Sequence, residues 1–177
     1  LNCYLGVEVH ADEPRVAELE TRYMESAHRV WFVNEPIRQW HQALYPQAAD
    51  KMRVVENGFD PGFAPAPHTT SAPADKPLRF AYIGTIGPRV PVEEFAMGWV
   101  EARQRVPELD GAQAELFGPM SHVRGRAELV AEAEPFGLHH RGPVAKADVA
   151  GVYDDADVLL LVLGAGRFVT SGKVYEY

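Results

Sequence analysis

The chain has 177 residues, of which 46% are hydrophobic and 24% are charged, a composition typical of globular proteins and not of disordered ones. Its 17 Lys and Arg against 25 Asp and Glu give a formal net charge of −8, which argues against broad binding to nucleic acid but permits one local anion pocket. The longest apolar run, residues 158–163, is far shorter than the ~20 residues that a bilayer crossing needs, and the single cysteine, Cys3, excludes an internal disulfide.

The first 58 residues alternate helical and strand patterns. Apolar residues at helical spacing predict a helix over residues 13–26, and a β-rich run predicts a short strand over residues 29–33. Asn34 is the expected cap of the next helix, because its side chain can accept a hydrogen bond from the open amides of a first helical turn. A second strand is expected over residues 52–55.

Prolines dominate the following stretch, residues 59–77. Five of them lie between Asp60 and Pro77. Because proline fixes φ and has no backbone N–H, this segment is expected to be an extended linker that separates two domains.

Strand and helix patterns alternate again after the linker. Strands are expected over residues 78–83, 114–117, 138–141 and 158–163, the last one apolar throughout as in a strand buried on both faces. The expected helices are at residues 92–106, at residues 121–131 with Ser121 as cap, at residues 148–154, and after Thr170 or Ser171. Four large aromatic residues are expected to fill cores: Tyr23, Trp31, Trp40 and Trp99. This alternation predicts an α/β fold, a Rossmann-like parallel sheet with helices on both faces.

The loop after the strand at residues 78–83 is the first candidate site, because parallel sheets bind ligands outside the carboxyl ends of their strands. It begins with Gly84 and Thr85 and reads GTIGPR, so its backbone can approach a phosphate closely and Arg89 can add a permanent charge. On these residues alone, a tight turn with a solvated arginine is the simpler interpretation. The fingerprint G-x-G-x-x-G is absent, so a nicotinamide cofactor gains little support.

A second candidate loop follows residues 158–163 and leads into the last predicted helix. Ser171 and Gly172 stand at the helix start and Lys173 lies in the first turn, where backbone amides attract anions. A lysine opposes the helix dipole there, so it needs either a negative partner or a path to solvent, and both interpretations stay open. Glu176, one turn later, can face the same pocket or pair with Lys173.

Metal sites gain little support from the sequence. Asp155 and Asp157 form a D-x-D pair, but they precede a strand and therefore lie at the edge of the sheet opposite the ligand edge. His139 and His140 are adjacent on a predicted strand, so their side chains point to opposite faces. Cys3 has no local base and no serine lies in a G-x-S-x-G context, so neither metal-dependent nor nucleophilic hydrolysis is expected.

Several short motifs occur in the order that is typical of glycosyltransferases with the GT-B fold. Residues 171–177 (SGKVYEY) resemble the S-G-K-[VF]-[YF]-E-Y segment of bacterial members related to family 4. Residues 54–60 (VVENGFD) resemble the N-G-[VF]-D junction between the two Rossmann-like domains of that family, and residues 78–84 resemble the first strand of its donor-binding domain. Further segments resemble the later turns of that domain, at residues 116–119, 141–144 and 153–158.

This resemblance implies transfer of a sugar from a nucleoside diphosphate sugar, with retention and without a metal or other cofactor. Arg89 and Lys173 would be the catalytic residues, because they would neutralise the departing diphosphate. Six further residues would bind the donor: Gly84, Thr85, Val144, Ser171, Gly172 and Glu176. Glu176 matches the second glutamate of the family's E-x7-E motif, which commonly holds the ribose, whereas Phe168 stands in place of the first.

The resemblance also implies a domain plan. Residues 1–58 would be the last elements of an amino-terminal, acceptor-side domain, residues 59–77 the linker, and residues 78–177 a donor-binding domain cut off inside its last helix. We therefore expect a fragment of a cytoplasmic enzyme that is inactive by itself and whose acceptor is a sugar, a lipid or a small molecule. Peripheral association with the inner face of the membrane stays open.

Three other functions are compatible with the sequence. A nucleotide-sugar epimerase of the same fold would need acidic catalytic residues that the chain does not show. A non-catalytic module would bind a nucleotide sugar without transferring it. A purely structural or interaction domain would bind no nucleotide at all.

Overall fold

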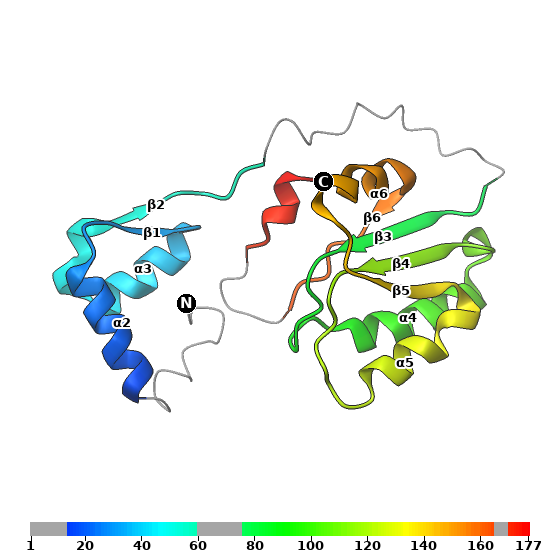
Figure 1. The fold of residues 1–177 in the computed structure, drawn as a ribbon, viewed down its shortest axis with the longest axis horizontal. Helices are drawn as coiled ribbons and strands as arrows, with labels where there is room; N and C mark the ends of the chain where they lie inside the picture. Colours follow the sequence, from blue (N-terminus) through cyan, green and yellow to red (C-terminus); the bar gives the residue numbers. More distant parts are fainter. Residues whose placement is uncertain (1–13, 60–75, 165–169) are drawn as a thin grey trace. The chain divides into compact units, whose positions relative to one another are not determined.

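The computed structural model describes residues 14–59, 76–164 and 170–177 (Figure 1). These residues form two compact units: a first unit of residues 14–59 and 170–176, and a second unit of residues 76–164 with Tyr177. The sequence predictions for Cys3, for residues 60–75 of the linker and for residues 165–169, which include Phe168, lie outside the described residues.

The first unit contains a two-stranded parallel sheet. Helix α2 (Pro14–Ser26) precedes β1 (Val30–Phe32), and α3 (Glu35–Leu44) and the 3-10 segment η1 (Pro46–Lys51) connect β1 to β2 (Met52–Val54). Six buried side chains form its core: Met24, Phe32, Ile37, Tyr45, Ala48 and Met52.

Asn34 caps α3 as predicted. Its side-chain oxygen accepts a hydrogen bond from the Ile37 amide at 2.9 Å, which satisfies one of the open donors of the first turn. Its side-chain amide donates to the Thr170 hydroxyl at 2.7 Å, so residues far apart in the sequence meet in this unit.

The second unit contains a four-stranded parallel sheet with the order β5-β4-β3-β6. Its strands are β3 (Arg79–Ile83), β4 (Gln113–Phe117), β5 (Leu138–Gly142) and β6 (Val158–Leu159). The chain moves outward from β3 to β5 and then returns to add β6 on the other side of β3. This is the strand order of half a Rossmann fold, and the point of reversal lies between β3 and β6.

Helices cover both faces of this sheet. α4 (Val92–Arg105) and α5 (Arg126–Glu132) lie on one face, and α6 (Val149–Asp155) lies on the other (Figure 1). Short 3-10 segments complete the described chain: η3 (Pro107–Leu109), η4 (Glu134–Phe136), η5 (Lys146–Asp148) and η6 (Gly172–Tyr175). The main core lies between the sheet and α4 and α5, where Trp99 is 5% exposed and donates its indole N–H to the Phe136 carbonyl at 2.9 Å. The predicted fold class, a Rossmann-like α/β arrangement with helices on both faces, is confirmed.

Two predictions about secondary structure are wrong. Ser121 does not cap a helix, because α5 begins only at Arg126, and the Ser121 hydroxyl instead donates to the Ile86 carbonyl at 3.0 Å. The apolar run at residues 158–163 is paired over Val158–Leu159 only, and Leu161 and Leu163 are 40% and 42% exposed. Among the described residues, β6 pairs with β3 on one side only, so the prediction of a strand buried over residues 158–163 does not hold for this part of the chain.

The expectation that Tyr23 and Trp31 fill a core is also wrong. They are 65% and 70% exposed. In α2 the buried residue is Met24 and not Tyr23. Trp31 lies on β1, where successive residues point to opposite faces, and the face that carries Phe32 packs against the core of the first unit.

Candidate functional site

The candidate site lies at the carboxyl ends of β3 and β6 in the second unit, where the strand order reverses. Open parallel sheets bind their ligands outside such a point. The chain leaves β3 through residues 84–91 and leaves β6 through residues 160–164. The two segments meet, because the Gly164 backbone lies against Arg89: a Cβ atom at position 164 would be 2.6 Å from the Arg89 carbonyl oxygen.

The loop after β3 is held by the loop after β4. The Gly84 amide donates to the Phe117 carbonyl at 2.8 Å, and the Ile86 amide donates to the Pro119 carbonyl at 2.9 Å. The Ser121 amide returns a hydrogen bond to the Ile86 carbonyl at 2.9 Å, and the Ile86 side chain is 1% exposed. The loop after β3 and the loop after β4 therefore continue the parallel pairing of the two strands, through a bridge between Ile86 and Met120.

Thr85 and Arg89 are the exposed residues of this loop that the sequence predicts to be functional. The Tyr82 hydroxyl donates to the Thr85 carbonyl at 3.3 Å, and burial raises the pKa of Tyr82, which keeps this donor protonated. The Val90 amide donates to the Gly87 carbonyl at 3.1 Å and closes the turn that carries Arg89.

Arg126 is an important residue of this region that the sequence did not reveal. It is 2% exposed, and its guanidinium pairs with Glu93 at 2.7 Å and donates to the Gly87 carbonyl at 2.9 Å and to the Ser121 hydroxyl at 3.1 Å. The hydrogen bond from Arg126 holds the pKa of Glu93 below its ordinary value, so the pair is ionic at neutral pH. No local pattern distinguishes Arg126 from a surface arginine.

A hollow of about 300 Å³ lies at the same edge of the sheet, beside the loop after β4. Its lining includes Met120, His122, Arg124 and Glu128. None of the site residues predicted from the sequence lines it. It adds room and two basic side chains next to the loop that supports residues 84–91.

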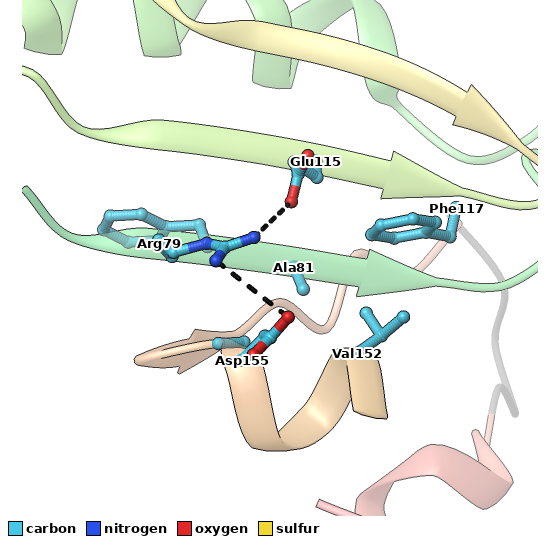
Figure 2. A pocket seen from close by; sticks show the side chains of 8 residues that line it. Arg79, Ala81, Glu115, Phe117, Val152 and Asp155 are labelled. Carbon is cyan, nitrogen blue, oxygen red and sulfur yellow. Dashed lines mark hydrogen bonds and ion pairs between the residues drawn. The ribbon is translucent and has the colours of Figure 1, made fainter. Parts of the chain in front are cut away.

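A smaller cavity of about 40 Å³ lies on the α6 face of the sheet, between β3, β4 and α6 (Figure 2). Arg79 donates to Glu115 at 3.3 Å and lies 4.0 Å from Asp155 (Figure 2), and Arg141 donates to Glu115 at 2.8 Å. Burial by itself raises the pKa of Glu115, but the hydrogen bonds from Arg141 and Arg79 outweigh it and hold that pKa below its ordinary value. Asp157 accepts a hydrogen bond from the Arg79 amide at 2.8 Å, so both acidic residues of the D-x-D pair lie close to Arg79.

The two adjacent histidines of β5 have different partners. His139 Nε2 lies 2.9 Å from the Gln113 side-chain oxygen, and His140 Nε2 lies 2.8 Å from the Gly118 carbonyl oxygen. Within residues 14–59, 76–164 and 170–177, no group of three or more His, Cys, Asp or Glu side chains is arranged to hold a metal ion.

The second predicted loop ends in the first unit. The Ser171 hydroxyl oxygen caps η6 and accepts a hydrogen bond from the Lys173 amide at 3.3 Å. Burial lowers the pKa of Lys173, and the negative charge of Glu176 offsets part of this effect. Lys173 and Glu176 therefore interact electrostatically within one turn.

The predicted site residues are divided between the two units. Gly84, Thr85 and Arg89 share one loop of the second unit, and Val144 follows β5 at the same edge of that sheet. Ser171, Gly172, Lys173 and Glu176 belong to the first unit. That Arg89 and Lys173 act on one diphosphate stays a prediction.

No protein-family model matches the chain, and no curated protein matches it. Its fold is similar to that of TarM from S. aureus, whose crystal structure contains fondaparinux, α-GlcNAc-glycerol and UDP, with a TM-score of 0.60 and 10% identity over 81% of this chain and 27% of that one. It is also similar to sucrose-phosphate synthase from Thermosynechococcus elongatus, with a TM-score of 0.59 and 19% identity over 88% of this chain and 40% of that one. The chain thus spans well under half the length of either protein.

At these identities the likeness shows the fold. It agrees with the strand order of the second unit and with the GT-B type of Rossmann-like fold that the sequence motifs implied. None of the helices in the described ranges combines the length and the apolar character that a membrane crossing requires.

Proposed function

We propose that this chain is part of a glycosyltransferase that moves a sugar from a nucleoside diphosphate sugar to an acceptor hydroxyl. The observation that carries the proposal is Arg89, held on a hydrogen-bonded loop at the reversal point of a Rossmann-like sheet, with its backbone against Gly164. The likeness in fold to TarM and to sucrose-phosphate synthase supports the same assignment.

The chemistry of transfer explains why cations are needed at this place. The bond between the anomeric carbon and the diphosphate oxygen breaks, and its electron pair leaves with the diphosphate. Arg89 would stabilise the developing negative charge through its fixed, permanently charged fork of donors. A divalent metal would then not be required for this step.

Lys173 would supply the second positive charge. It must be protonated to do so, and burial, which lowers its pKa, makes its charge depend on the negative charge of Glu176 and of the bound diphosphate. A half-buried cation of this kind gains more from an approaching anion than a fully solvated one, because water screens the interaction less.

The remaining contacts follow the order of the motifs. Gly84 and Thr85 would lie beside the diphosphate, and Val144 would lie beside the base. Ser171 and Gly172 would offer backbone amides to the phosphates, and Glu176 would hold the ribose.

We propose that the acceptor hydroxyl attacks from the face that the diphosphate leaves, which retains the anomeric configuration. The new bond joins the acceptor oxygen to the anomeric carbon. The hydroxyl proton passes to the departing phosphate oxygen, which lies on the same face. The acceptor would be a sugar, a lipid or a small molecule.

Calorimetric titration with UDP, GDP, ADP and pyrophosphate tests the proposal. We expect one nucleoside diphosphate to bind, and we expect Arg89→Ala to weaken that binding about tenfold or more, because a hydrogen bond to a charged group contributes roughly 1.5–3 kcal/mol. Arg105→Ala is the matched control, since Arg105 is an exposed arginine in the last turn of α4, whereas the candidate site precedes the first turn.

Two results would count against the proposal. Absence of binding to all four compounds would favour a structural or interaction domain. The transfer assay uses the full-length protein, because this chain is expected to be inactive by itself. Binding by the full-length protein without any transfer from the corresponding nucleotide sugar to an acceptor, as measured by mass spectrometry of the products, would favour a binding module.

A further inference from the structure

We infer that Arg126 is the positioning residue of the anion-binding loop: it fixes the backbone on both sides of Arg89. This inference rests on the proposed function, in which Arg89 contacts the diphosphate. Arg126 would act through Arg89 and would not itself touch the ligand.

The first argument is the set of carbonyl groups that Arg126 holds. Its Nη1 donates to the Gly87 carbonyl at 2.9 Å, and its Nη2 donates to the Val90 carbonyl at 3.2 Å and to the Pro88 carbonyl at 3.4 Å. Positions 88 and 90 are the immediate neighbours of Arg89. One guanidinium therefore fixes the Pro88–Arg89 peptide and the Val90–Pro91 peptide, on either side of Arg89.

The second argument is that the loop has few backbone donors of its own. Positions 88 and 91 are prolines, which have no backbone N–H to donate. Its two local hydrogen bonds run from the Val90 amide to the Gly87 carbonyl at 3.1 Å and from the Val92 amide to the Val90 carbonyl at 2.8 Å. Buried Arg126 adds a donor to each of these two carbonyl groups and also donates to the Pro88 carbonyl. An arginine has five N–H donors in a planar fork, a number and geometry that a lysine cannot reproduce.

The third argument is that Arg126 joins three elements. Its Nε and Nη2 donate to the two carboxylate oxygens of Glu93 at 2.7 and 3.0 Å, at the start of α4. Its Nη1 also donates to the Ser121 hydroxyl at 3.1 Å, and that hydroxyl donates to the Ile86 carbonyl at 3.0 Å. The loop after β3, the loop after β4 and the first turn of α4 are thus held by one side chain that is 3% exposed.

Arg103 provides a matched control in the same unit. Its side chain is 14% exposed, and it donates to the Phe136 carbonyl at 3.1 Å and to the Leu109 carbonyl. It is therefore a second mostly buried arginine that holds backbone carbonyl groups, but its partners precede strands β5 and β4 instead of following β3. A merely structural role would make Arg103→Lys and Arg126→Lys alike in their effects on ligand binding.

The test measures pyrophosphate affinity by calorimetry for the wild type, Arg126→Lys, Arg103→Lys, Arg89→Ala and the Arg89→Ala/Arg126→Lys double variant. We expect Arg126→Lys to weaken pyrophosphate binding about fivefold to tenfold, and Arg103→Lys to change it less than about twofold. Since Arg126 acts through Arg89, adding Arg126→Lys to Arg89→Ala should cause no further loss, which is the non-additivity of two coupled residues.

Amide hydrogen exchange without ligand gives a second readout. In Arg126→Lys the amides of Ile86 and Val90 should exchange faster than in the wild type, and in Arg103→Lys they should not. If Arg126→Lys does not fold, the Arg126→Met/Glu93→Leu pair replaces it, because it leaves no unpaired buried charge. That pair should show the same loss of pyrophosphate affinity.

The outcomes separate this inference from the proposed function. Wild-type protein that does not bind pyrophosphate or a nucleoside diphosphate would overturn the proposed function. Binding that depends on Arg89 but is unchanged by loss of Arg126, or that weakens additively in the double variant, would overturn only the positioning role of Arg126.

Discussion

Gly118 lies against Gly84 so closely that a Cβ atom at position 118 would be 2.0 Å from the Gly84 carbonyl oxygen. Its φ of 134° is a conformation that residues with a side chain rarely adopt. The His140 ring lies 2.8 Å from the Gly118 carbonyl oxygen on the β5 side. Gly118 is thus the point at which the loop after β4 approaches the loop that leads to Arg89.

We expect Gly118→Ala to lower the free energy of unfolding by about 2–4 kcal/mol, because the new methyl group would meet backbone atoms that cannot move independently. Urea denaturation measures the effect. Gly98→Ala is the control: Gly98 lies within α4 with nothing within 4 Å of an added Cβ, so alanine should raise the unfolding free energy by about 0.5–1 kcal/mol. Equal stability of Gly118→Ala and wild type would contradict the close approach.

Gly164→Ala should weaken pyrophosphate binding by about threefold to tenfold, since roughly 1 kcal/mol of lost positioning corresponds to such a factor. The Cβ atom would be 2.6 Å from the Arg89 carbonyl oxygen, so the loop that carries Arg89 must shift. Calorimetry measures the affinity. Gly151→Ala in α6 is the control, because an added Cβ there meets nothing within 4 Å, and its affinity should equal that of the wild type.

Because the pKa of Lys173 is lowered, we expect nucleotide binding to weaken at alkaline pH. Burial lowers the pKa of Lys173, so the ammonium charge is lost as the pH rises through a value below that of an ordinary lysine. Affinity for the diphosphate should therefore fall at alkaline pH. In Lys173→Arg the fall should disappear, because a guanidinium stays protonated up to about pH 12. An identical alkaline decline in both proteins would exclude Lys173 as its cause.

Because the pKa of Glu115 is lowered in the folded protein, we expect the free energy of unfolding to decline in acid. Its folded-state pKa is held below the ordinary value, so its contribution is present above the pKa of the unfolded chain, about 4.3, and is lost as the pH falls through the folded-state pKa. Glu115→Gln should lower the free energy of unfolding by about 1–2 kcal/mol at pH 7, and the difference from wild type should shrink toward about pH 3. Urea denaturation at both pH values measures this effect.

Glu132→Gln is the control for Glu115→Gln. Glu132 is an exposed glutamate on α5, outside the Arg79–Glu115–Arg141 group. Its replacement should leave stability unchanged at both pH values. A difference between Glu115→Gln and wild type that stays constant from pH 7 to about pH 3 would show that the ionised carboxylate is not the stabilising form.

The parts of the fold that could be predicted from the sequence depend on local signals. Asn34 caps α3 because the capping interaction spans only three residues, and β3 and β4 were found because their residues combine β propensity with clear boundaries. The end of β6 was not predictable from its apolar run. In the described residues only Val158–Leu159 pair with β3, and a hydrophobic run does not reveal how many of its residues will find a partner strand.

The candidate site could be predicted only in part, for a similar reason. The rule that loops at the carboxyl ends of parallel strands lie at one edge led to residues 84–89, and the approach of Gly164 to Arg89 agrees with it. Arg126 was missed because its partners lie 33 to 39 residues earlier in the chain, apart from Ser121. Its burial arises from tertiary packing, and no feature of the neighbouring sequence indicates it.

The three tryptophans of the chain are divided between the two units in a way that gives each unit its own optical signal. Trp31, 70% exposed, and Trp40 belong to the first unit, whereas Trp99, 5% exposed and hydrogen-bonded to Phe136, is the tryptophan of the second. Replacing Trp31 and Trp40 with phenylalanine would leave a single buried emitter whose fluorescence changes only when the second unit opens. Stopped-flow fluorescence of that variant, set beside a Trp99→Phe variant, would time the unfolding of each half separately and reveal whether the halves melt in one cooperative step.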